Sequence, residues 1–308
     1  MSGSVRSSAG LVWHHRRLLW WIFAMNLALA WLGSLPVRAT LSAVLDRSLE
    51  SAKLVTGFDV STLVLLMERP EVQMPALASG TMGAAAIFLL AMLMMDGGVF
   101  TVYLEDRKLS RPEFFGSCGL YFWRMVRLAL VSVVPFGALI AAEIAMGVYA
   151  GRLSSNAPQE RLGFYVNVAS KLLIVLVALL VRLWFDLAQA RVVNGNTRRL
   201  FRELWRSFKA TFRSGLYGKY LGIAAFAAAS MVVGIWVWAM LPHQAMGASF
   251  VVLELVTVVQ IASRLWMKAA SARWVALLPD ELAMGTVALE TARTPVIAET
   301  ALDSPQPE

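Results

Sequence analysis

Residues 172–193 read LLIVLVALLVRLWFDLAQARVV, a run of ten apolar residues followed by a segment that carries Arg182, Asp186 and Arg191. A helix of about 20 residues crosses the roughly 30 Å hydrocarbon core of a bilayer. The apolar run and the residues before it reach that length, and the charges that come after it mark a membrane surface. We therefore predict a transmembrane helix at 165–188.

The rest of the chain repeats this pattern. Of its 308 residues, 58% are hydrophobic and 16% are charged, with a mean hydropathy of +0.63. Soluble domains contain about 25% charged residues, so this much apolar surface requires lipid as part of its solvent. The predicted fold is an all-α polytopic transmembrane helix bundle. Its six spans lie at about 18–36, 80–103, 125–148, 165–188, 217–241 and 249–272.

The distribution of positive charge predicts the orientation of the bundle. Of the 28 Lys and Arg residues, 20 lie on the side of the two termini, including the span ends there, 6 lie on the opposite side, and Lys171 and Arg182 lie inside spans. Cytoplasmic loops are rich in Lys and Arg, so both termini are expected in the cytoplasm. The same rule explains the net charge of +8 without a nucleic-acid partner. We expect a multi-pass protein of a bacterial inner (cytoplasmic) membrane.

Several segments outside the spans have patterns of their own. In the membrane domain, 1–278, outer interfacial helices are expected at 38–69 and a basic amphipathic helix at 197–213, which suits an anionic lipid surface. Ser110 and Glu113 have the spacing of a capping box at a helix start. The acidic, proline-containing tail, 279–308, is expected to be disordered.

The segment RLWFDLAQARVV at 182–193 is similar to a second segment, RLWMKAASARWV at 264–275. The two are identical at seven of twelve positions. Both segments end the second helix of a predicted hairpin. The simplest explanation is a duplication in which the third and fourth helices correspond to the fifth and sixth. The first two helices are a candidate third copy.

The helix end DLAQARVV (186–193), the basic amphipathic helix after it and the six spans resemble a group of uncharacterised bacterial six-helix membrane proteins. The group includes the membrane domain joined to some glycerophosphodiester phosphodiesterases. Its members more often have an aromatic residue at the position of Leu187. The resemblance implies a membrane scaffold and supplies no catalytic residues.

Three charged residues lie at similar depth on the outer side of the predicted spans: Glu143, Lys171 and Glu254. Charges inside a bilayer are costly, so each needs a partner or a function. One interpretation is a polar site for a proton, a cation or a lipid headgroup. The other, which we favour, is an interhelical salt bridge between Glu143 and Lys171.

A second group of charges lies near the cytoplasmic ends of the spans. Arg182 and Asp186 have the i,i+4 spacing of an ion pair on one helix face. Asp96 is expected to need a cation from the third or fourth helix, with Arg127 and Arg182 as candidates. The alternative to structural pairing is a headgroup site for anionic lipid. The predicted cluster contains Asp96, Arg127, Arg182, Asp186, Arg264 and Lys268.

Sequence motifs of enzymes are missing. The chain has no HExxH, GxSxG or P-loop motif and only one cysteine, Cys118. We therefore expect no catalytic residues, no metal site and no cofactor. The expected function is a non-enzymatic membrane scaffold or accessory subunit, with membrane lipids, a membrane-protein partner or a second copy as its partners. The alternative is a transporter or lipid-handling protein that uses Glu143, Lys171 and Glu254.

Overall fold

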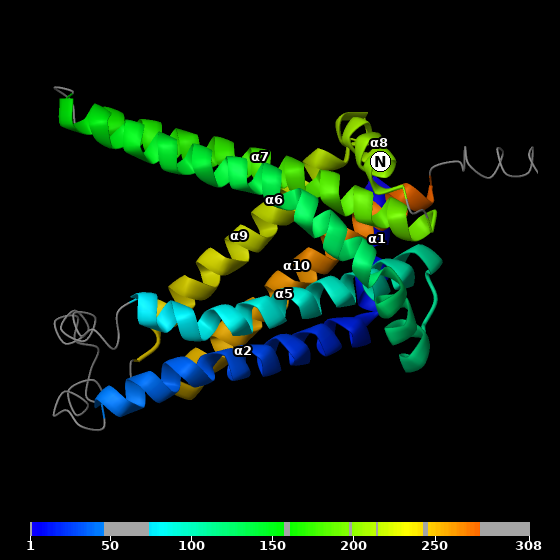
Figure 1. The fold of residues 1–308 in the computed structure, drawn as a ribbon, viewed down its shortest axis with the longest axis horizontal. Coiled ribbons are helices and arrows are strands. Elements are labelled where there is room, and N and C mark those ends of the chain that lie inside the picture. The colour runs from blue at the N-terminus through cyan, green and yellow to red at the C-terminus, as the bar shows by residue number, and fades with distance from the viewer. Residues whose placement is uncertain are drawn as a thin grey trace, which may run out of the picture. The chain divides into compact units, whose positions relative to one another are not determined.

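The computed structural model describes residues 2–45, 74–156, 161–196, 199–213, 215–242 and 246–277. The chain divides into two units, Met1–Val275 and Ala276–Glu308, and the helix bundle belongs to the first. All regular elements in the described residues are helices (Figure 1). They are α1 (Ser2–His14), α2 (Arg16–Leu45), α5 (Met74–Glu105), α6 (Arg111–Asn156), α7 (Arg161–Asn194), α8 (Leu200–Arg213), α9 (Leu216–Met240) and α10 (Met246–Ala276).

Six of these helices are long and apolar enough to cross a membrane, which confirms the predicted all-α fold with six spans. They are α2, α5, α6, α7, α9 and α10. Helix α6 packs along both α5 and α7, and α2 lies beside α5 (Figure 1). The neighbours α5, α6 and α7 therefore pack as antiparallel hairpins, as their short connections favour.

Helix α6 is much longer than its predicted span at 125–148. It has 46 residues, so at 1.5 Å per residue it is about 70 Å long and exceeds the hydrocarbon core. At its start the glutamate half of the predicted capping box is formed: the Ser110 N–H donates to Glu113 Oε2 at 2.8 Å, and the Ser110 hydroxyl donates to the same carboxylate oxygen at 2.8 Å. This cap begins the helix at Arg111. The segment before the predicted span and the span itself are one continuous helix.

The described part of the segment 38–69 differs from the prediction of separate interfacial helices there. Helix α2 continues through Pro36 to Leu45 without a break. Residues 38–45 are therefore the last turns of α2, and 46–69 lie outside the described residues, as does the predicted tail at 279–308.

The predicted amphipathic helix at 197–213 is present as α8. The side chains of Phe201, Trp205 and Phe212 are exposed. The side of α8 that is buried carries mainly small and polar residues: Glu203, Leu204, Ser207, Ala210 and Thr211. The Trp184 indole N–H of α7 donates to the Leu204 carbonyl at 2.8 Å. Small side chains thus face the protein, Phe208 packs on the Trp184 ring, and the other aromatic side chains of α8 point away from the protein.

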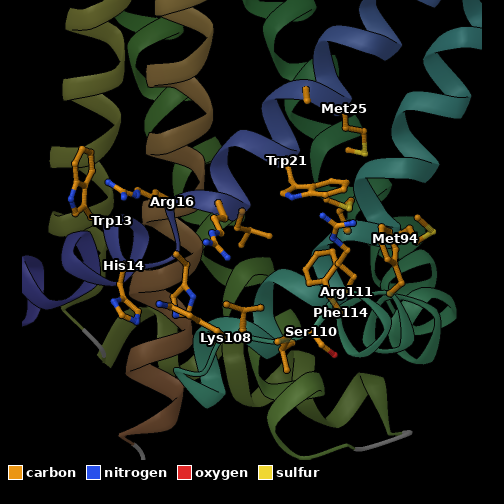
Figure 2. A pocket seen from close by; sticks show the side chains of 18 residues that line it. Trp13, His14, Arg16, Trp21, Met25, Met94, Lys108, Ser110, Arg111 and Phe114 are labelled. Atoms are coloured by element: carbon orange, nitrogen blue, oxygen red, sulfur yellow. The ribbon is translucent and has the colours of Figure 1, made fainter.

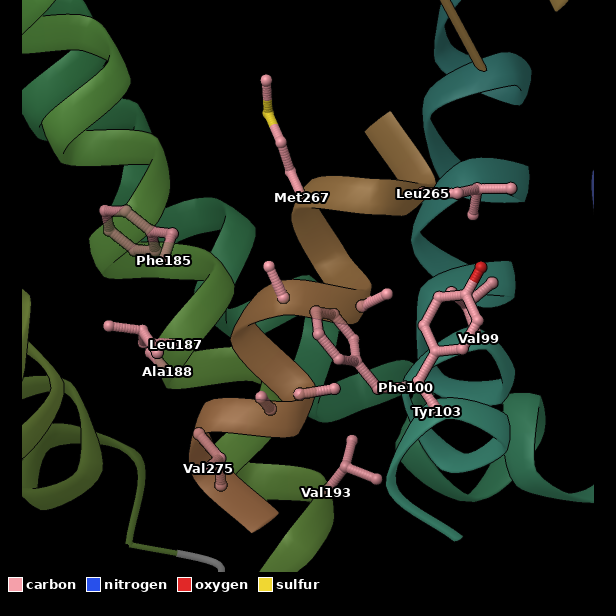
Figure 3. Close-up of a cluster of buried hydrophobic side chains, with 14 of the residues drawn as sticks. Val99, Phe100, Tyr103, Phe185, Leu187, Ala188, Val193, Leu265, Met267 and Val275 are labelled. Atoms are coloured by element: carbon pink, nitrogen blue, oxygen red, sulfur yellow. The ribbon is translucent and has the colours of Figure 1, made fainter. Parts of the chain in front are cut away.

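The hydrophobic core gathers at one end of the spans (Figure 3). Phe100 and Val99 of α5 lie among Leu187, Val193 and Leu265 from α7 and α10. The core is built mostly from 93–103 of α5, 118–128 of α6, 183–193 of α7, 216–223 of α9 and 261–275 of α10. Both copies of the repeated segment lie in this core.

The two copies also have matching environments. Leu183 and Leu265 are buried at equivalent positions, as are Ala190 and Ala272. The repeated tryptophans each donate from the indole nitrogen to another helix: Trp184 to α8 and Trp266 to Ser8 Oγ of α1, at 3.1 Å. This agreement in packing supports the predicted duplication.

Close contact between α5 and α6 depends on glycine. A Cβ atom at Gly98 would lie 2.6 Å from both Cys118 Sγ and Phe114 Cε2. We predict that Gly98→Ala lowers the free energy of unfolding by about 1–3 kcal/mol, the usual cost of overpacking. In the control variant Gly116→Ala the new Cβ meets nothing within 4 Å. Denaturant titration in detergent measures both, and equal stability of the two variants would contradict the prediction.

Candidate functional site

Four helices contribute charged or hydroxyl side chains to a cluster beside the core. The cluster consists of Asp96 of α5, Arg182 and Asp186 of α7, Tyr220 of α9 and Lys268 of α10. We call these five residues the polar network. Buried charges are tolerated in proteins when they are paired and hydrogen-bonded.

Asp96 forms an ion pair with Lys268. The two side chains are only 18% and 15% exposed, respectively. The Lys268 ammonium also lies 5.5 Å from the centre of the Phe100 ring, within the range of a cation–π contact. The ion pair thus joins α5 to α10 next to the core.

This pairing corrects the sequence prediction, which sought the cation for Asp96 on the third or fourth helix. Arg127 is exposed, and Arg182 is instead paired with Asp186. The partner comes from the sixth span because the fold places α10 against α5. In the alignment of the two repeated segments, Lys268 occupies the position that corresponds to Asp186.

The predicted pair of Arg182 and Asp186 is present, with Arg182 Nε 3.9 Å from Asp186 Oδ2. Asp186 is buried, with 6% of its surface exposed. The i,i+4 spacing on α7 brings the guanidinium alongside the carboxylate. The network therefore has two carboxylates and two cations, and its formal charges cancel.

Tyr220 completes the network and was not predicted. Its hydroxyl lies 2.9 Å from Asp186 Oδ2 and 2.9 Å from the Met267 carbonyl oxygen, and it can donate its one proton to either acceptor. The side chain is fully buried. From the sequence, a tyrosine at the start of an apolar span is expected at the lipid interface. Its role as a hydrogen-bond donor in the polar network becomes visible only because the structure buries this face of α9.

Two residues of the predicted cytoplasmic cluster lie outside the network. Arg127 and Arg264 are exposed, and within the described residues neither forms an ion pair. Nearby, Arg124 Nη1 donates to Asn196 Oδ1 at 2.7 Å. The structure thus brings four of the six predicted residues together and leaves two at the surface.

The other predicted site, Glu143, Lys171 and Glu254, lies in a different part of the spans. Lys171 is exposed, and the two glutamates are partly exposed. The predicted salt bridge between Glu143 and Lys171 is not formed. Among the residues that the structure describes, no carboxylate lies within 4.0 Å of Lys171, and no cation within 4.0 Å of Glu143 or Glu254. Among all described residues, no group of three or more His, Cys, Asp or Glu side chains could hold a metal ion.

Comparisons with known proteins found no match: no family model, curated protein or solved structure is similar to the chain. The resemblance to the membrane domain joined to some phosphodiesterases therefore stays a prediction. The function of the protein has to be inferred from the geometry of its described residues.

Proposed function

We propose that this protein is a non-enzymatic integral membrane scaffold or accessory subunit that packs against lipids and partner membrane proteins. It is placed in the cytoplasmic membrane with both termini in the cytoplasm, because the basic residues concentrate on that side. The observation that carries the proposal is the uneven packing of the spans.

Side chains of the spans are buried mainly toward the end that contains the core, and farther out close contacts are local, as between Gly163 and Ser154 and between Gly234 and Val256. No side chain is buried at 82–92 of α5, 129–149 of α6, 171–182 of α7, 224–233 of α9 or 247–260 of α10. We call these stretches the open half. Its exposed residues are large and apolar, as in Ile140, Leu172 and Val232. Helix faces of this kind need a cover of lipid or of other membrane helices.

The open half also holds Glu143, Lys171 and Glu254. A charge facing lipid is costly, whereas a charge at a helix–helix interface finds an opposite charge or a polar group. The unpaired side chains therefore favour a partner helix, either from another protein or from a second copy of this chain. The polar network has balanced charges, and its role is to hold four helices together.

Site-specific photocrosslinking in native membranes tests this proposal. The photoreactive amino acid replaces Leu172, which lies in the open half and is 62% exposed. The control position is Leu120 of α6, which lies beside the core and is 60% exposed. We expect a protein adduct of discrete mass from position 172 and none of that mass from position 120. Lipid adducts alone from position 172 would contradict a partner at this face.

The transporter alternative has a different outcome. Proteoliposomes of the purified protein would then dissipate a proton or cation gradient. The triple variant Glu143→Gln, Lys171→Gln, Glu254→Gln would abolish this leak. The scaffold proposal predicts no leak from either protein, and loss of the discrete crosslink in the triple variant.

A further inference from the structure

A cavity of about 1120 Å³ lies where the start of α2 meets the end of α5 and the start of α6 (Figure 2). It is separate from the polar network and shares none of its residues. Its volume slightly exceeds the range of about 300–1,000 Å³ for small-molecule sites, so it has room for more than a small ion.

One part of the cavity is strongly basic. Arg16, Arg17, Lys108 and Arg111 line it, and none of the described Asp and Glu residues does. In the part of the chain that the structure describes, none of these four cations has a carboxylate within 4.0 Å. Four cations around one cavity without a compensating acid favour an anionic ligand.

The acids near this cavity are already engaged by other groups. Arg107, which does not line the cavity, contacts Glu105 at 2.5 Å and Glu113 at 3.5 Å. Asp106 lies 3.5 Å from Arg273 and 3.6 Å from His15. Burial lowers the pKa of His15, so its imidazole adds little charge at neutral pH. The positive charge of the cavity therefore comes from its Arg and Lys side chains.

The other part of the cavity is apolar. Trp21, Met25, Met94 and Phe114 line it, and Figure 2 shows them grouped around Arg111. The Arg111 guanidinium lies 5.6 Å from the centre of the Trp21 ring, so a cation–π contact holds it at the border of the basic and apolar parts. A guanidinium has a planar set of donors that matches phosphate oxygens.

We propose that this cavity binds an anionic phospholipid, with its phosphate at Arg111 and its acyl chains along Trp21, Met25 and Met94. The proposal rests on the membrane placement in the proposed function, which puts the basic residues of the cavity at the cytoplasmic leaflet. At that depth headgroups meet acyl chains, as basic and apolar side chains meet in the cavity. A free phosphate would leave the apolar part without a ligand.

Native mass spectrometry of the full-length protein in mild detergent tests the proposal by lipid titration. The probes are phosphatidylglycerol, phosphatidylcholine with the same acyl chains, and water-soluble glycerol phosphate. We expect phosphatidylglycerol to bind most tightly. Arg111→Gln should weaken its binding about tenfold, because a charge-assisted hydrogen bond is lost.

Arg107→Gln is the matched control, because it removes an exposed cation of the same loop that does not line the cavity. Its effect should stay within about twofold. An equal loss in Arg107→Gln and Arg111→Gln would overturn the proposal in favour of general charge attraction. Equal binding of phosphatidylcholine would exclude an anionic ligand.

Met25→Trp tests the apolar part by filling it. We expect weaker binding of phosphatidylglycerol and unchanged binding of glycerol phosphate. Competition by glycerol phosphate at concentrations similar to those of the lipid would overturn the lipid assignment and indicate a site for a free phosphate ester. These titrations use isolated protein, so their failure is distinguishable from a failure of the partner crosslink at Leu172.

Discussion

Replacing Lys268 by methionine is expected to lower the free energy of unfolding by about 3–5 kcal/mol, the usual cost of removing one partner of a buried ion pair. Methionine keeps much of the length and volume of lysine but leaves the Asp96 carboxylate without its cation. Asp96 is only 18% exposed, and its ammonium partner lies 5.5 Å from the centre of the Phe100 ring, so water replaces the lost ammonium poorly. Reversible unfolding in mixed micelles measures the change.

A double-mutant cycle distinguishes loss of the pair from loss of packing. Adding Asp96→Asn to Lys268→Met removes the uncompensated charge, so the double variant should regain most of the lost stability. Lys268→Met should also cost far more than Arg264→Met one turn earlier, because Arg264 is exposed. A double variant no more stable than Lys268→Met alone would show that the pair contributes through packing rather than charge.

Tyr220→Phe is expected to cost about 1.5–3 kcal/mol, the range for a hydrogen bond to a charged group. The variant keeps the ring but removes the hydroxyl that lies 2.9 Å from Asp186 Oδ2. Asp186 then keeps only Arg182 of its two partners in the network, at 3.9 Å. The loss is large because both Tyr220 and Asp186 are buried.

Tyr217→Phe is the control on the same helix. Its hydroxyl donates to the Leu176 carbonyl oxygen at 2.9 Å, a neutral hydrogen bond at a partly buried position. Its removal should cost about 0.5–1.5 kcal/mol. If Tyr217→Phe proves as destabilising as Tyr220→Phe under the same unfolding conditions, the carboxylate of Asp186 does not depend on the Tyr220 hydroxyl.

Local features of the chain were predictable because they depend on residues close in sequence. The six spans follow from apolar length, and the start of α6 follows from Ser110 and Glu113, three residues apart. The pair of Arg182 and Asp186 is set by one turn of a single helix. The cytoplasmic placement of both termini is a prediction of the same kind, based on charge counts.

Long-range contacts were not predictable, and here the expectations were wrong. The cation for Asp96 comes from a residue 172 positions later in the chain, and the salt bridge expected between Glu143 and Lys171 is not formed. Hydropathy shows that a helix crosses the membrane but not which neighbour it touches or how it is rotated. The cavity likewise combines side chains from 13–25 with others from 94–115.

The amino-acid pattern alone therefore established how often the chain crosses a membrane, where most spans lie and which segment is duplicated. These features depend on length, apolarity and identity within one segment. The tertiary structure decided which charges pair, that Tyr220 is buried among them, and that most buried side chains of the spans gather toward one end. Those features depend on the rotation and crossing of helices, which side chains far apart in sequence set together.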